Sequence, residues 1–159
     1  MVTAAHVRTR SVRLLDHEFR LFRVPPSRIT GATLVWRGSK RVPVSGRERT
    51  IVDGLRQPGL CGGIRHLVHI MSEYGSSGER DAQKLAQVAR EAGTGAVWKR
   101  LGYLTELLWT EDKGLRDEAA KHLTTGNARL DPTVQRRGML LRRWRLWINV
   151  PVSRETDAS

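Results

Sequence analysis

The spacing of hydrophobic residues changes twice along this chain, and this change limits the folds open to it. Near both ends, apolar and polar residues alternate, which is the period of a β-strand with one buried face. Between residues 45 and 123 the apolar residues recur every three or four positions, which is the period of an amphipathic helix. Because strand and helix patterns occupy separate stretches, the sequence predicts an α+β fold.

The first third of the chain predicts strands. His17–Val24 mixes aromatic, aliphatic and arginine residues, and Pro25-Pro26 ends it. Residues Ala32–Trp36 and Lys40–Val44 flank Arg37-Gly38-Ser39, so they predict a β-hairpin. Pro43 has no amide hydrogen to donate, which favours an edge strand for the second arm.

The C-terminal region returns to strand over Trp144–Val150. Alternation places Trp144, Leu146, Ile148 and Val150 on one face, and Arg143, Arg145, Trp147 and Asn149 on the other. We expect this strand to join the N-terminal strands in one small mixed or antiparallel sheet, packed on a central bundle of helices.

Four to five helices are expected in the middle of the chain. Ser45 and Glu48 have the spacing of a capping box, so the first helix is predicted to begin at Ser45 and to end before Pro58. The later helices are predicted after Gly62-Gly63, after an Asp81 cap, over Ala96–Trp109 and over Leu115–Leu123.

Length and composition limit the class of protein. With 159 residues, the chain suits one folded domain, expected over residues 10–150, with a disordered arm at 1–9 and a flexible tail at 151–159. No apolar run approaches the roughly 20 residues of a membrane helix, and the N-terminus lacks the apolar stretch of a secretory signal. Cys61 is the single cysteine, which excludes an internal disulfide. We expect a soluble cytoplasmic protein without a membrane partner.

The charge is strongly positive and lies at the ends of the chain. The net charge is +12, from 28 basic and 16 acidic residues. Residues 1–56 carry 12 basic and 4 acidic side chains, residues 57–127 carry 9 of each, and residues 128–159 carry 7 and 3. Such a distribution attracts polyanions, chiefly nucleic acid, although many basic proteins bind nothing specific.

Two short patterns resemble chemical sites. Cys61-Gly62-Gly63 precedes a helix and could bind an anion or hold a reactive thiol, but the glycines equally permit a tight helix entry. His66, His69 and Glu73 lie on one helical stripe at metal-ligand spacing, but a solvated polar face explains them better. No catalytic motif is present, so we expect no metal, no cofactor and no enzymatic activity.

Arginines provide the candidate binding residues. Arg136, Arg137, Arg142, Arg143 and Arg145 cluster near Trp147, and cations beside an aromatic ring suit RNA or another single strand. The alternative is a charged sheet face that only keeps an edge soluble. Arg47 and Arg49 at the start of the first helix form a second candidate surface, although Arg49 can simply pair with Asp53 one turn later.

Two motifs resemble one family. The stretch Val44–Ile64 and the later Lys99–Leu104 resemble signatures of the AbiEi-type antitoxins of bacterial type IV toxin–antitoxin systems, and the likeness covers roughly Arg10 to Val150. The residues that carry the likeness are Ser45, Glu48, Arg49, Thr50, Asp53, Cys61, Gly62, Gly63, Arg100, Leu101, Gly102 and Tyr103.

The resemblance implies an antitoxin that opposes a nucleotidyltransferase-like toxin, either by binding that toxin or by binding the RNA that the toxin modifies. Family members usually carry an N-terminal winged helix-turn-helix, and no such pattern fits before the first strand of this chain. A stand-alone nucleic-acid-binding transcriptional regulator is the alternative, and a folded remnant without a function is a third possibility.

Overall fold

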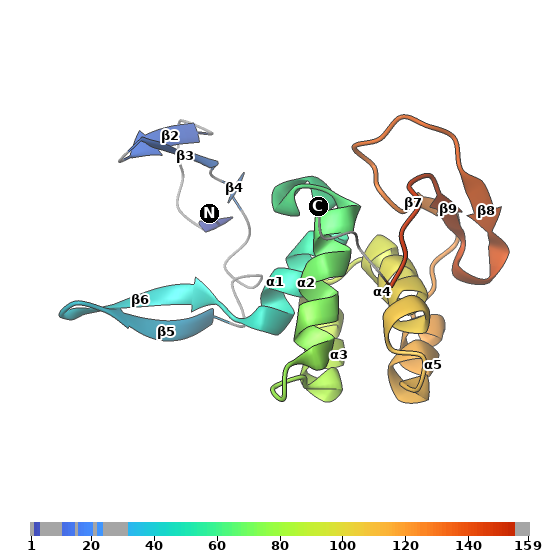
Figure 1. Ribbon diagram of the computed structural model, residues 1–159, viewed down its shortest axis with the longest axis horizontal. Helices are drawn as coiled ribbons and strands as arrows, with labels where there is room; N and C mark the ends of the chain where they lie inside the picture. The colour runs from blue at the N-terminus through green and yellow to red at the C-terminus, as the bar shows by residue number, and fades with distance from the viewer. Residues whose placement is uncertain (1, 4–10, 15, 21, 24–31, 155–159) are drawn as a thin grey trace.

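A computed structural model describes residues 2–3, 11–14, 16–20, 22–23 and 32–154, and it has the expected α+β class (Figure 1). The helices are α1 (Arg47–Arg56), α2 (Ile64–Ser76), α3 (Ala82–Ala92), α4 (Gly95–Leu108) and α5 (Lys113–Lys121), with short 3-10 turns η2 (Pro58–Cys61) and η3 (Arg142–Trp144). The longer strands are β5 (Ala32–Arg37) and β6 (Lys40–Ser45), and three shorter ones are β7 (Ala128–Arg129), β8 (Met139–Leu141) and β9 (Leu146–Ile148).

The core lies among the helices. The apolar stripes predicted from helical spacing are buried: those of α1 and α2 meet, and α4 packs against both. Fully buried members include Ile51, Leu55, Leu67, Met71, Leu85, Leu101 and Leu104. Asp81 caps α3 as predicted, since its carboxylate accepts a hydrogen bond from the Lys84 amide at 2.9 Å. No helix in the described part of the chain is long and apolar enough to cross a membrane.

The first helix does not begin with the predicted capping box. Ser45 is the last residue of β6, and Gly46 occupies the N-cap without a side-chain hydrogen bond. Glu48 is 5% exposed and turns into the core, where it accepts a hydrogen bond from the Tyr74 hydroxyl at 2.9 Å. Glu48 therefore contacts α2 instead of forming the capping box, so the capping box predicted from the spacing of Ser45 and Glu48 is wrong.

The predicted hairpin is present, but it stands apart from the rest of the structure. β5 and β6 pair antiparallel from Ala32 opposite Ser45 to Arg37 opposite Lys40, and Gly38 in the turn has a φ of 62°. Figure 1 shows this hairpin extending away from the helices. Along both strands only Val35 is even half-buried.

The expectation that the last strand joins the N-terminal strands is wrong. β9 lies between β7, which is parallel to it, and β8, which is antiparallel. The chain that follows α5 supplies both neighbours, so each edge of β9 is already paired and cannot accept the hairpin. The predicted strand is also shorter than expected, because residues 142–144 form η3 and Arg145 adopts a left-handed conformation with a φ of 51°.

The described residues near the N-terminus form two short strand pairings. The predicted strand His17–Val24 is divided into β3 (His17–Arg20), which pairs with β2 (Ser11–Leu14), and β4 (Phe22–Arg23), which pairs with β1 (Val2–Thr3). The rest of the 1–9 arm and residues 155–159 lie outside the described residues. The first part of the predicted tail contacts the helices, since an Arg154 Nη donates to the Leu108 carbonyl at 3.1 Å.

Candidate nucleic-acid interface

The outer face of the three-stranded sheet presents an arginine beside a tryptophan. In the register of the sheet, Arg129 of β7 and Leu140 of β8 both lie opposite Trp147 of β9. Side chains alternate along β9, so Leu146 is fully buried while the Trp147 residue is 37% exposed. The strand pattern over 146–148 was therefore predicted correctly, and Trp147 is on the outer face as expected.

A buried polar network positions the loop that joins β7 to β8. Asn149 donates from its side-chain amide to the carbonyls of Asp131 at 2.7 Å and Val134 at 2.9 Å. The Asp131 carboxylate accepts hydrogen bonds from the Ile64 amide at 2.8 Å and from the Thr133 amide at 2.9 Å. The sequence pattern predicted Asn149 on the same face as Trp147. Asn149 is instead 3% exposed, because its side chain is hydrogen-bonded to the backbone of the β7–β8 loop.

The same loop carries Arg136 and Arg137 to the outer face of the sheet. Gly138 follows them, and a Cβ atom at this position would lie 2.0 Å from the Ile148 carbonyl oxygen, so only glycine allows the loop to approach β9 so closely. The result is a cavity of about 570 Å³ lined by Arg129, Arg136, Arg137, Gly138 and Trp147. We call this the Arg/Trp cavity.

The charge of the Arg/Trp cavity is unbalanced. None of the described residues that line it is acidic. Within the described residues Arg136 and Arg137 form no ion pair, and the Arg129 side chain donates only to the Gln135 amide oxygen, at 3.3 Å. Three arginines that line one cavity, with no acidic residue among its described lining, favour an anionic ligand.

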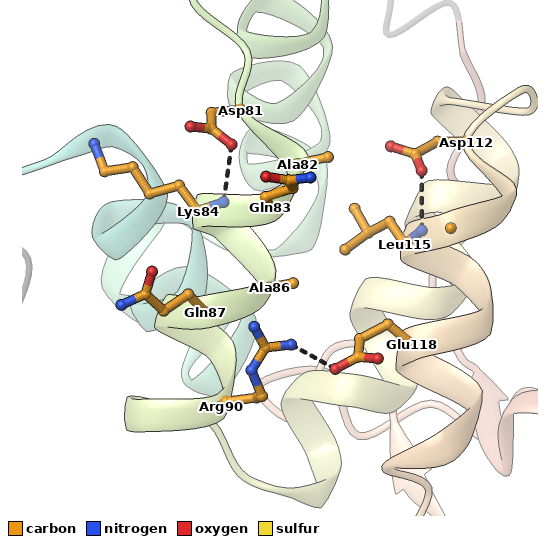
Figure 2. A pocket seen from close by; sticks show the side chains of 11 residues that line it. Asp81, Ala82, Gln83, Lys84, Ala86, Gln87, Arg90, Asp112, Leu115 and Glu118 are labelled. Atoms are coloured by element: carbon orange, nitrogen blue, oxygen red, sulfur yellow. Dashed lines mark hydrogen bonds and ion pairs between the residues drawn. The ribbon is translucent and has the colours of Figure 1, made fainter.

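A second cavity, between α3 and α5, has the opposite character (Figure 2). Its volume is about 710 Å³. Each of its charged lining residues has a partner in the structure: Asp81, Lys84, Arg90, Asp112 and Glu118. Figure 2 shows Arg90 and Glu118 paired across the space and the two aspartates capping their own helices. Because each of these charges already has a partner, either across the cavity or on a neighbouring residue, we assign no ligand to this cavity.

Three of the predicted C-terminal arginines do not belong to the Arg/Trp cavity. Arg143 forms an ion pair with Glu106 of α4 and lies 5.9 Å from the centre of the buried Trp144 ring. Arg145 donates weakly to the Thr124 carbonyl at 3.4 Å. Arg142 is exposed on η3. The short 3-10 turn breaks the alternation that had placed Arg143 and Arg145 beside Trp147.

The arginines at the start of α1 have structural partners. Arg49 is 3% exposed, and its Nε lies 2.9 Å from an Asp53 carboxylate oxygen, as the spacing predicted. Arg47 is exposed and pairs with Glu79. The Thr50 hydroxyl donates to the Gly46 carbonyl at 3.0 Å. This part of the family-like motif therefore folds the N-terminal half of the helical core, and Arg49 is not available at the surface.

The second family-like motif lies on α4 and is also part of the fold. Arg100 is 3% exposed, Leu101 is fully buried and Gly102 lies under the Trp144 ring. Burial raises the pKa of the half-buried Tyr103. The described residues of this motif thus contribute to the packing of α4 against η3 and the neighbouring helices.

The remaining sequence candidates are structural as well. Gly62 and Gly63 have φ angles of 79° and 100°, and the amide at the start of α2 is occupied by the Asp131 carboxylate. Burial, and then the nearby charge of Asp53, raise the pKa of the Cys61 thiol, which makes it less reactive. The His69 Nε2 atom lies 3.2 Å from Glu73, and no metal-binding cluster occurs among the described residues.

Sequence reasoning found Arg136, Arg137 and Trp147 but missed Arg129 and the role of Gly138. Arg129 belongs to a strand of two residues, which is too short to show a periodicity. The hydrogen bond from the Asp131 amide to the Asn149 side chain joins residues 18 positions apart, and no periodicity in the sequence predicts such a pair.

Comparisons of the chain with protein-family models, with curated proteins and with solved structures gave no match. The function is therefore argued from the geometry of the Arg/Trp cavity and from the motifs in the sequence.

Proposed function

We propose that this chain is an antitoxin-like protein that binds single-stranded RNA in the Arg/Trp cavity and thereby opposes a nucleotidyltransferase-like toxin. The observation that carries the RNA-binding part is the convergence of Arg129, Arg136 and Arg137 with Trp147 around one cavity, whose described lining residues include no acidic one. The antitoxin part is supported by the resemblance of the two sequence motifs to AbiEi-type antitoxins.

The chemistry of the cavity suits one nucleotide of a single strand. An arginine guanidinium matches the geometry of a phosphate group and can donate two hydrogen bonds to it. An exposed indole ring offers a stacking surface to a base, and single strands present bases that are free to stack. The volume of about 570 Å³ is in the range of small-ligand sites, which run from about 300 to 1,000 Å³.

A binding measurement tests the RNA interface. Fluorescence anisotropy with a labelled single-stranded RNA is compared for the native chain, for Trp147→Ala and for Arg136→Gln/Arg137→Gln. Loss of stacking in Trp147→Ala is expected to weaken binding by about 1–3 kcal/mol. The slope of log K against log salt is negative, and the double variant is expected to make it shallower by about 1.4. Each lost contact to a single strand contributes about 0.7 to the magnitude of this slope.

The matched control for the double variant is Lys113→Gln/Lys121→Gln, which removes the same charge from α5. Retention of the native affinity and slope in this control shows that the position of the arginines matters, beyond the total charge. Equal losses in both double variants would reduce the interface to non-specific attraction and contradict the proposal.

A growth experiment tests the antitoxin part. The neighbouring gene is induced alone, with the native chain, and with Arg136→Gln/Arg137→Gln. Rescue by the native chain and loss of rescue in the variant are the expected results. A toxic neighbour that the native chain does not rescue, while RNA binding is intact, would shift the conclusion to a stand-alone nucleic-acid-binding regulator.

A further inference from the structure

A second basic surface lies on the hairpin β5–β6, which Figure 1 shows at the opposite end of the structure from the strands β7, β8 and β9. Residues 32–45 include three cations, Arg37, Lys40 and Arg41, and no acidic residue. All three lie around the turn, at the end of the hairpin that is farthest from α1. Arg37 and Lys40 form no ion pair within the described part of the chain.

The hairpin contributes almost nothing to the core. The large apolar residues Leu34 and Trp36 are 59% and 60% exposed, and Val42 and Val44 are also exposed. An isolated two-stranded hairpin is only marginally stable in water, so an exposed arm of this kind needs a functional reason. Each strand of six residues spans about 20 Å, at roughly 3.3 Å per residue.

The cations occupy both faces of the hairpin. Residues that lie opposite each other in an antiparallel pair share a face, so Arg37 and Lys40 are on one face. Trp36 and Arg41 are on the other face, where the Arg41 guanidinium lies 4.7 Å from the centre of the Trp36 ring. A flat partner would meet cations on one face only, whereas a groove has a charged wall on each side.

From this arrangement we propose that the β5–β6 hairpin is an arm that enters a groove of double-stranded DNA. The major groove admits a two-stranded β-ribbon, and phosphates line both of its sides. Arg37 and Lys40 contact one phosphate wall, and Arg41 contacts the other. Trp36 and the exposed aliphatic residues of the arm provide apolar contact with the sugars and the thymine methyl groups in the groove.

The test is the salt dependence of binding to a short labelled DNA duplex, measured by anisotropy between about 50 and 200 mM salt. Arg37→Gln/Lys40→Gln is expected to reduce the magnitude of the negative slope of log K against log salt by about 1.8, because each lost phosphate contact on B-DNA contributes about 0.9. Trp36→Ala is expected to weaken binding while the slope stays unchanged, because it removes no charge.

Lys113→Gln/Lys121→Gln on α5 is again the matched control, and its slope is expected to remain native. All these residues are exposed, so the thermal midpoint of each variant is expected to equal that of the native chain. A native slope in the hairpin variant would overturn the proposal. So would a dimer of the native chain that Leu34→Thr dissociates, because the arm would then bind a second copy.

The two nucleic-acid proposals fail separately. Duplex binding that depends on the hairpin is expected to persist in Arg136→Gln/Arg137→Gln, since the hairpin and the Arg/Trp cavity share no residue. Binding of RNA without binding of duplex DNA would overturn the hairpin proposal and leave the proposed function intact.

Discussion

Single buried polar residues hold the helical core to the C-terminal sheet, and Arg100 is the clearest example. Its Nη1 donates to the Leu55 carbonyl at 2.6 Å, and its Nη2 donates to the Arg129 carbonyl at 2.7 Å. Burial lowers the pKa of Arg100 to about 10, although the nearby charge of Asp131 opposes this shift, so the side chain remains charged at neutral pH. One guanidinium thereby joins the end of α1 to β7.

Replacement of Arg100 is expected to destabilise the fold strongly. Arg100→Met leaves buried carbonyl oxygens without a donor, and we expect a loss of about 2–4 kcal/mol in the free energy of unfolding. Arg100→Lys keeps the charge but lacks the planar fork, so an intermediate loss is expected. Urea unfolding at neutral pH measures both. A Met variant as stable as the native chain would show that these carbonyls do not need Arg100.

Gly102 shows how a contact reverses the usual effect of a substitution. Replacing a glycine inside a helix with alanine normally stabilises it by about 1 kcal/mol. A Cβ atom at position 102, however, would lie 2.1 Å from the Trp144 ring, whose Nε1 donates to Glu106 at 2.7 Å. We expect Gly102→Ala to destabilise the protein by about 1–3 kcal/mol, because the ring must move.

Gly114 in α5 is the matched control for that prediction. A Cβ atom at this position would meet nothing closer than an Asp112 oxygen at 3.8 Å. Gly114→Ala is therefore expected to be stabilising, by about 0.5–1 kcal/mol. Differential scanning calorimetry of the two variants measures the contrast, and shifts of the same sign would contradict it.

At the scale of elements, the β7–β8 loop is attached to the start of α2 through Asp131. This carboxylate is 3% exposed and takes the place of a local N-cap, because Gly63 has no side chain to cap α2. Burial by itself raises the pKa of Asp131, but hydrogen bonds from Thr133 and the Ile64 amide, together with the charge of Arg100, outweigh it. The net pKa of Asp131 is therefore below its ordinary value.

The lowered pKa predicts a stability that acid removes. A carboxyl group with a lower pKa in the folded state stabilises the fold above its unfolded pKa, and this contribution disappears as the pH falls through the folded pKa. We expect Asp131→Asn to be less stable at neutral pH by about 1–3 kcal/mol. We also expect its stability to fall less steeply than that of the native chain below about pH 4.

Urea unfolding at several pH values checks this prediction, with Asp117→Asn on the exposed side of α5 as the control. The control is expected to follow the native pH profile. Parallel profiles for the native chain and Asp131→Asn would show that the carboxylate does not stabilise the folded state through its charge.

At the scale of the whole molecule, the two basic surfaces described above lie on different parts of the fold. The hairpin lies at one end of the longest axis and the C-terminal sheet at the other, with the helices between them (Figure 1). The intervening residues 57–127 have equal numbers of basic and acidic side chains, and some of these form ion pairs, such as Arg80 with Asp112 and Arg90 with Glu118. The two proposed interfaces therefore lie at separate places, and the effects of their variants are expected to be independent.

The sequence alone determined the α+β class, the hairpin, the five helices and their buried stripes. These features follow from local causes: the period of the apolar residues, the Asp81 cap, and the glycines that end or begin an element. It also indicated that Arg136, Arg137 and Trp147 belong together, because they are close in the chain and charge patterns are visible in sequence.

The tertiary structure decided the partners of β9, the burial of Glu48 and Asn149, and the inclusion of Arg129 in the Arg/Trp cavity. Each of these depends on residues distant in the chain. Glu48 faces Tyr74 and Lys84 instead of capping its own helix, and Arg143 turns toward Glu106 instead of lying beside Trp147. The physical reason is that a buried polar group must find a partner wherever the packed chain supplies one, and local spacing does not record that partner.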